Sequence, residues 1–258
     1  MQARGAQAAA WRRLAAQAGA QAPLLTAPNP SAAGLCQLCR GPAWPGRDRC
    51  FRCHRYGQCL PGLLPDVVVP VAYAVKGGQH ATNLWLYKSE RSGATAAGSA
   101  LRSLLLVFLR DHGGCVWRQA RTPGPSHVAV VPSRRGRPDM HPLQWLAAPY
   151  LRLTWVRLAL ARRDDPSAHD PDPSLFLPQR LPGASVLLLD DTWTTGASAT
   201  SAAAALRLAG ARSVAVVVLG RHLDDYALAL AAGGGAGTSL GMPFRPWLCA
   251  VHAPDRSQ

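Results

Sequence analysis

The fold is decided by residues 185–220, which read SVLLLDDTWTTGASATSAAAALRLAGARSVAVVVLG. The first five residues are almost wholly apolar, which is typical of a strand covered on both faces in a parallel sheet. Residues 197–208 are rich in alanine and leucine and precede Gly210, a pattern that predicts a helix and its end. Residues 214–219 form a second apolar run. The stretch therefore predicts a strand–helix–strand unit of an α/β domain.

The loop between the first strand and the helix contains acidic and hydroxylated residues. Asp190 and Asp191 end the strand, and the chain continues as TWTTGAS over residues 192–198. A loop that leaves the carboxyl end of a parallel strand and enters a helix directs backbone N–H groups and the positive end of the helix dipole to one point. This point suits a phosphate, and the carboxylates suit sugar hydroxyls or a divalent cation. The alternative is an ordinary capping turn, which requires neither two acids nor two threonines.

The same run resembles the phosphoribosyl-pyrophosphate (PRPP) motif of type I phosphoribosyltransferases. The resemblance implies that Asp190 and Asp191 are the catalytic acids and hold the ribose 2′ and 3′ hydroxyls. It also implies that PRPP is bound by the turn that follows, which consists of Thr192, Thr194, Thr195, Gly196, Ala197 and Ser198.

Five of the seven cysteines lie within residues 36–59. Cys36 and Cys39 form one C-x-x-C pair, and Cys50 and Cys53 form a second pair ten residues later. This spacing brings four thiolates onto one tetrahedral Zn²⁺ and predicts a zinc ribbon over residues 34–62. Disulfides are the alternative, and the expected intracellular setting disfavours them. Cys115 and Cys249 have no partner visible in the sequence, and we interpret both as small apolar residues.

Arginine residues are frequent along the ribbon, and two interpretations of them stay open. They can offset the negative charge of a zinc–thiolate centre, or they can form a nucleic-acid-binding face with Trp44, Phe51 and Tyr56 as stacking groups. The arginines are Arg40, Arg47, Arg49, Arg52 and Arg55.

A second loop with a functional pattern follows the apolar strand predicted at residues 127–131. It begins with Pro132 and places three guanidinium groups around a glycine, which suits a pyrophosphate. A solvated basic turn is the alternative. The predicted pyrophosphate-binding residues are Ser133, Arg134, Arg135 and Arg137.

The order of these features is similar to that of ComF-like phosphoribosyltransferases over residues 34–222. The resemblance rests on the four-cysteine ribbon, Lys76-Gly77, the strand that ends in Val-Pro with arginines, and the acidic loop. It implies a type I phosphoribosyltransferase-like α/β fold, with a parallel sheet flanked by helices, in residues 63–258. Residues 135–139 read RGRPD, where family members usually carry an Arg-Gly-Phe-Asn-Gln run.

The remaining segments give coarser expectations. Residues 1–33 are rich in alanine, glutamine and arginine and predict a disordered tail, with a loose basic helix at residues 11–20 as the alternative. We expect a strand at residues 67–74 that is broken by Pro70, a helix at 94–112, mostly helical structure at 143–163 and a long surface loop at 163–182. The chain has no apolar run of membrane-spanning length and no secretory signal pattern, so we expect a cytoplasmic protein without membrane insertion.

Two functions follow as hypotheses. The first is an enzyme, a glycosyltransferase that moves the 5-phosphoribosyl group from PRPP, bound with Mg²⁺, to an unknown acceptor and releases pyrophosphate. The second is a non-enzymatic protein of this fold that binds nucleic acid through its ribbon, in DNA uptake (competence) or regulation. The net charge of +14 favours polyanionic partners without choosing between the two. Single-stranded nucleic acid and a second copy of the chain, in a homodimer, are further candidate partners.

Overall fold

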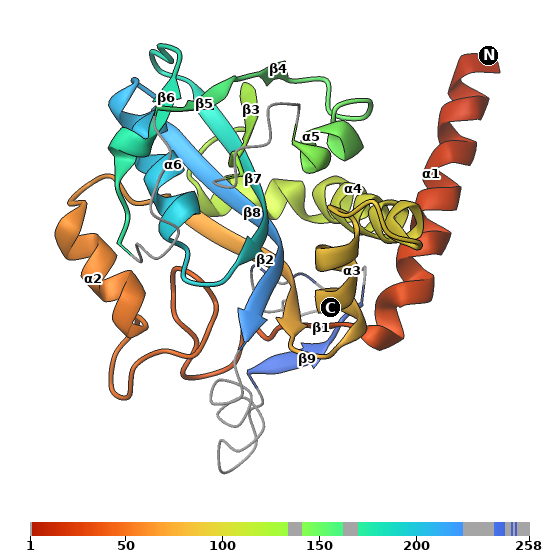
Figure 1. Ribbon diagram of the computed structural model, residues 1–258, viewed down its shortest axis with the longest axis horizontal. Coiled ribbons are helices and arrows are strands. Elements are labelled where there is room, and N and C mark those ends of the chain that lie inside the picture. The colour runs from red at the N-terminus through yellow and green to blue at the C-terminus, as the bar shows by residue number, and fades with distance from the viewer. Residues whose placement is uncertain are drawn as a thin grey trace.

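The computed structural model describes residues 2–133, 141–161, 170–223 and 240–245, together with Cys249 and Val251. Helices and strands are arranged around one central sheet (Figure 1). The α-helices are α1 (Gln2–Gln21), α2 (Phe51–Cys59), α3 (Gln79–Leu86), α4 (Ala94–Gln119), α5 (Pro142–Ala147) and α6 (Ala197–Leu208), and the 3-10 helices are η1 (Ala22–Leu24) and η2 (Pro173–Leu175). The strands are β1 (Thr26–Pro28), β2 (Val67–Val75), β3 (His127–Val130), β4 (Thr154–Trp155), β5 (Leu158–Leu160), β6 (Phe176–Pro178), β7 (Ser185–Trp193), β8 (Ser213–Leu223) and β9 (Gly241–Pro243).

The central sheet has five strands in the order β2-β8-β7-β3-β4, and all neighbouring pairs are parallel. The unit predicted from residues 185–220 is confirmed as β7–α6–β8, with Gly210 in the left-handed region after the helix. In register, Leu189 of β7 lies between Val130 of β3 and Val217 of β8. The carboxyl ends of these strands therefore meet at one edge, where side chains from distant parts of the sequence converge.

Both faces of the sheet are buried, as the apolar runs predicted. Helix α6 covers one face and α3 and α4 cover the other (Figure 1). Because side chains alternate along a strand, Leu187 and Leu189 of β7 join the core cluster on the α4 side, whereas Val186 and Leu188 join the cluster on the α6 side. The structure is thus a mixed α/β protein with a central parallel sheet flanked by helices.

The N-terminal segment differs from the expectation. Residues 2–28 form α1, η1 and β1, so the prediction of a disordered tail is wrong for them. Helix α1 packs along α4, where Leu14 is 5% exposed and Ala18 is fully buried. Strand β1 pairs with β9, which comes from the other end of the chain. The alanine-rich sequence did not reveal this helix clearly, because the helix is stabilised by apolar contacts with α4, which is distant in sequence.

Three further expectations are corrected. Strand β2 runs through Pro70 without a break, which is possible because β2 is an edge strand of the central sheet. Residues 143–163 are only briefly helical, since α5 ends at Ala147 and β4 and β5 follow. Within the predicted loop at 163–182, the described part contains η2 and β6, and Leu175 and Phe176 are buried there.

Among the residues that the structure describes, no helix is both long enough and apolar enough to cross a bilayer.

Candidate functional site

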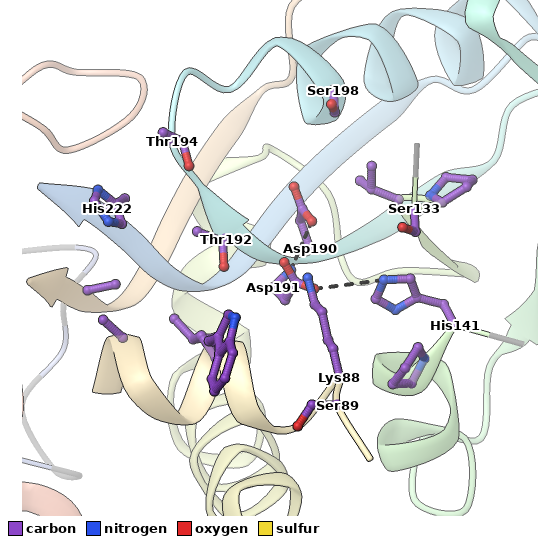
Figure 2. A pocket seen from close by; sticks show the side chains of 17 residues that line it. Lys88, Ser89, Ser133, His141, Asp190, Asp191, Thr192, Thr194, Ser198 and His222 are labelled. Carbon is purple, nitrogen blue, oxygen red and sulfur yellow. Dashed lines mark hydrogen bonds and ion pairs between the residues drawn. The ribbon is translucent and has the colours of Figure 1, made fainter. Parts of the chain in front are cut away.

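A cavity of about 850 Å³ lies at the carboxyl edge of the sheet. Its walls come from the ends of β2, β3, β7 and β8, from α3 with the residues that follow it, and from the start of α6 (Figure 2). The volume is within the usual range for small-molecule sites. The site residues that the sequence predicted in this cavity are Asp190, Asp191, Thr192, Thr194, Ser198 and Ser133.

The two adjacent carboxylates face different sides of β7 because consecutive side chains alternate. Figure 2 shows Asp190 on the side where Ser198 lies and Asp191 directed toward Lys88 and His141. Asp190 is partly exposed and accepts a hydrogen bond from the Asp191 backbone N–H at 2.9 Å. Loss of hydration raises the pKa of Asp190 well above its usual range, and the neighbouring Asp191 charge adds to this effect.

Asp191 is buried, with 4% of its surface exposed, and is held by three side chains. The Lys88 ammonium forms an ion pair with its carboxylate, and the Tyr87 hydroxyl donates to Oδ2 at 2.5 Å. The Nε2 atom of His141 lies 3.8 Å from the same oxygen. Burial acts to raise the pKa of Asp191, but Lys88 and the Tyr87 hydroxyl outweigh it and hold the pKa below its usual value. Asp191 is therefore a charged carboxylate, and the Lys88 ammonium neutralises its charge.

Sequence reasoning missed Tyr87, Lys88 and His141 because they come from other elements. Tyr87 and Lys88 follow α3, and His141 caps the start of α5, where its Nδ1 accepts from the Leu143 backbone N–H at 3.1 Å. An accepting Nδ1 leaves the proton of a neutral imidazole on Nε2, the atom that faces Asp191. One signal was available: Lys88 is one of only two lysines in a chain with 26 arginines. A compact ammonium fits where a planar guanidinium does not.

The turn after the strand is fixed by Gly196 and Trp193. Gly196 has a φ of +83° and is the N-cap residue of α6, and a Cβ there would lie 2.1 Å from the Trp193 ring. Trp193 is 1% exposed and belongs to the core cluster on the α6 side. The turn therefore needs glycine for its backbone conformation and for space. Trp193 packs inside the protein rather than covering the cavity.

The remaining residues of the turn divide between the cavity and the interior. Thr192, Thr194 and Ser198 line the cavity, whereas Ala197 is 3% exposed and packed in the core. The Thr195 hydroxyl accepts from the Ala197 backbone N–H at 3.2 Å. The first turn of α6 therefore begins beside the cavity, and helix starts of this kind attract anions.

The predicted arginine loop is only partly described. Ser133 lines the cavity, directly after β3, whereas Arg134, Arg135 and Arg137 lie outside the described residues.

The four cysteines of the ribbon form one cluster. The Sγ atoms of Cys36, Cys39, Cys50 and Cys53 all lie within 4.8 Å of one another, and Cys39 and Cys50 are 3.8 Å apart. The Cys39 backbone N–H donates to Cys36 Sγ at 3.5 Å, and the Cys53 backbone N–H donates to Cys50 Sγ at the same distance. Such N–H groups satisfy sulfur atoms that carry negative charge. Four thiol ligands in this arrangement can hold a structural zinc ion.

The thiols of this cluster shift one another's pKa in opposite directions. The hydrogen bond between Cys36 and Cys39 lowers the pKa of the Cys36 thiol and raises that of Cys39. The lowered pKa is in the direction that favours a thiolate, which is the form that binds zinc.

The cysteine cluster and the turn at residues 192–198 belong to the same part of the core. Cys36, Cys39 and Cys53 share a core cluster with Trp193. Burial raises the pKa of the Tyr56 hydroxyl, and a hydrogen bond with the Thr195 side chain acts in the opposite direction. The ribbon helix α2 therefore touches the turn through Tyr56.

Arg221 of β8 also lies between the two regions. Its Nη1 donates to the carbonyls of Trp193 at 3.2 Å and Thr194 at 3.1 Å. On the ribbon side, its guanidinium lies so close to Gly41 that a Cβ there would be 2.7 Å from Nη2. The guanidinium thus fixes the backbone of the turn relative to the ribbon.

The predicted stacking groups of the ribbon are not all on its surface. Trp44 is 46% exposed and Phe51 is 56% exposed, and their rings meet edge to face with centroids 5.6 Å apart. Tyr56 is 1% exposed, so the prediction that it stacks on bases is wrong. Arg55 forms an ion pair with Asp170.

No protein-family model matches the chain, and no curated protein has a significantly similar sequence. The fold and the site define its class: an α/β protein with a parallel sheet, a cavity at the carboxyl edge and a four-cysteine cluster.

Proposed function

We propose that the protein transfers the 5-phosphoribosyl group of PRPP to an acceptor and releases pyrophosphate. The observation that carries the proposal is the cavity at the carboxyl edge, where Asp190, Thr194 and Ser198 lie together beside the start of α6. Hydroxyl groups and a helix N-terminus suit the 5′-phosphate, and a carboxylate suits the ribose diol. Ser133, in the loop after β3, supports a diphosphate site at the other side of the cavity.

The roles of the two acids differ in this proposal. Asp190 accepts hydrogen bonds from the 2′ and 3′ hydroxyls of the ribose, while Asp191 keeps Lys88 and His141 in position under the strand. The acceptor attacks the anomeric carbon, and the bond to the pyrophosphate oxygen breaks with its electron pair on the leaving group. The Asp190 carboxylate stabilises the oxocarbenium-like positive charge that develops on the ribose.

Magnesium fits this site in one respect: Asp190 is a carboxylate whose pKa is raised by burial and by the Asp191 charge, and the charge of Lys88 does not offset this. Asp190 and the diphosphate oxygens would hold the ion, which neutralises negative charge as pyrophosphate leaves.

The test is pyrophosphate release from PRPP and Mg²⁺ with a panel of nucleobases and amines. We expect release with at least one acceptor, and a reduction of at least a hundredfold in Asp190→Asn. Glu90→Gln removes one negative charge from an exposed residue outside the cavity and serves as the matched control, with unchanged release. If no acceptor supports release above the buffer rate, the enzymatic proposal is wrong.

Exposed aromatic groups on the ribbon favour a second candidate function. Trp44 and Phe51 present their rings to solvent near the exposed Arg47 and Arg52, a combination that binds single-stranded nucleic acid. The measurement is binding of a labelled oligonucleotide to the full chain over a range of salt concentrations. The candidate function predicts affinity that falls steeply with salt and falls at least tenfold in Trp44→Ala. Affinity that is equal in the wild type and Trp44→Ala would rule out this face.

A further inference from the structure

A second cluster of metal-ligating side chains shares no residue with the cavity lining, and it brings together residues that are far apart in the sequence. The donor atoms of His112, Cys115 and Cys249 all lie within 4.8 Å of one another. His112 and Cys115 are three residues apart on α4, a spacing that places both side chains on one face of a helix. Cys249 comes from the C-terminal segment. The interpretation of both cysteines as merely small apolar residues is therefore incomplete.

The two thiols receive hydrogen bonds of the kind found in the ribbon. Arg118 Nη2 donates to Cys115 Sγ at 3.4 Å, and the Val251 backbone N–H donates to Cys249 Sγ at 3.3 Å. In the ribbon, the corresponding bond from the Cys39 backbone N–H to Cys36 Sγ is 3.5 Å long. Each sulfur atom is therefore held in place by a donor from the protein, Arg118 for Cys115 and the Val251 backbone for Cys249.

The histidine is held in place for ligation. His112 is 7% exposed, and its ring packs against Phe108, one helical turn earlier, with centroids 5.5 Å apart. Burying an imidazole in an apolar core costs free energy unless the ring is hydrogen-bonded or binds a metal ion. The His112 ring supplies a third ligand of the type that zinc accepts.

We propose that His112, Cys115 and Cys249 bind a second zinc ion. A zinc ion with ligands at about 2.0–2.3 Å places neighbouring ligand atoms roughly 3.5–3.8 Å apart in a tetrahedron, so the cluster needs little rearrangement to close on it. One imidazole nitrogen and two thiolates select a borderline-soft metal such as zinc over magnesium or calcium. Among the described residues these three side chains supply the ligands.

The ion would join the C-terminal segment to α4. Val251 is 4% exposed and belongs to the same core cluster as residues of α4, so this end of the chain already packs there. A metal bond between Cys249 and the helix adds a constraint between parts of the chain that are distant in sequence. The site is independent of the cavity and of the reaction proposed above.

The test is the zinc content of the full chain, purified with a reductant and measured by mass spectrometry of the metal. The wild type is expected to hold two zinc ions per chain, and Cys115→Ser and Cys249→Ser are expected to hold one each. Cys59→Ser changes an exposed cysteine outside both clusters and is expected to keep two. Circular dichroism of each variant verifies that the helices are retained, and Cys249→Ser, at the end of the chain, covers the case in which Cys115→Ser fails to fold.

Cobalt substitution provides an independent readout. The cobalt-loaded wild type should show thiolate-to-cobalt absorption from two sites, and Cys249→Ser should lose the part contributed by two thiolates and one imidazole. One zinc per chain in the wild type overturns the proposal, as does a second zinc that both serine variants retain. A Cys115–Cys249 disulfide with one bound zinc, detected in the intact mass of protein prepared without reductant, also overturns it.

Discussion

The cysteine cluster and the cavity at the carboxyl edge are neighbours with opposite physical designs. The cluster takes its four ligands from 18 consecutive residues, and three of them are fully buried. The cavity takes its walls from residues between Ala74 and His222 and is lined by charged and hydroxylated groups. The two regions meet at Trp193, whose ring packs with the cysteines while its loop lines the cavity. The buried cysteine cluster therefore supports the loop that lines the open cavity.

The largest effect is expected from breaking the cluster. Cys53→Ser or removal of zinc by a chelator should lower the free energy of unfolding by on the order of 10 kcal/mol, because the binding energy of a structural zinc is folding energy. The melting temperature and the change in tryptophan fluorescence on unfolding report the loss. Cys59→Ser, an exposed cysteine, should change stability by less than about 0.5 kcal/mol. A chelated protein with an unchanged melting temperature would contradict the supporting role of the cluster.

A smaller effect is expected where the two regions meet. Gly196→Ala should lower the free energy of unfolding by about 3 kcal/mol, because left-handed backbone strain adds to a clash with the Trp193 ring. Gly77 is the matched control: its φ is +81°, and a Cβ there meets nothing within 4 Å. Gly77→Ala should therefore lower stability by only about 1–2 kcal/mol. Denaturant unfolding measures the difference, and equal effects would mean that the ring does not limit the turn.

In the cavity, the ion pair between Lys88 and Asp191 can be broken from either side, and the two substitutions should lower stability by different amounts. Lys88→Met should lower stability by about 2–3 kcal/mol because it removes the ammonium that pairs with the buried Asp191 carboxylate. Asp191→Asn should lower it less, since the Lys88 side chain is 34% exposed and can be hydrated.

The pH dependence of stability gives a second test of the ion pair between Lys88 and Asp191. The folded pKa of Asp191 is lowered, so its stabilising contribution is present above the unfolded pKa and is lost as the pH falls through the folded pKa. The difference between wild type and Lys88→Met should therefore shrink below about pH 4. A difference that is constant from pH 3 to pH 8 would show that Lys88 acts by packing alone.

The smallest effect has the opposite sign. Asp190→Asn should raise stability by about 1 kcal/mol at neutral pH, because it removes a carboxylate that burial and Asp191 disfavour. A raised folded pKa means that the penalty is absent below the unfolded pKa, grows as the pH rises above it and is complete above the folded pKa. The gain in melting temperature should accordingly be seen at pH 8 and vanish near pH 3. If Asp190→Asn is less stable than the wild type at pH 8, the Asp190 carboxylate does not carry the energetic penalty assigned to it.

Sequence reasoning succeeded where the signal is local. The two C-x-x-C pairs and the unit β7–α6–β8 were predicted because their spacing and apolar runs lie within short stretches. It failed where partners are distant: α1 is a helix that packs on α4, and Pro70 is tolerated only because β2 lies at the sheet edge. Tyr87 and His141 contact Asp191 only in the folded protein, and no pattern in the sequence around them predicts these contacts.

In the proposed function, the cavity binds a sugar diphosphate through Asp190. This binding can be measured by isothermal titration of PRPP with Mg²⁺ into the wild type, Asp190→Asn and Glu90→Gln. We expect saturable one-to-one binding to the wild type and Glu90→Gln, and at least tenfold weaker binding to Asp190→Asn. Equal affinity of the wild type and a folded Asp190→Asn, or no heat of binding with the wild type, would contradict it.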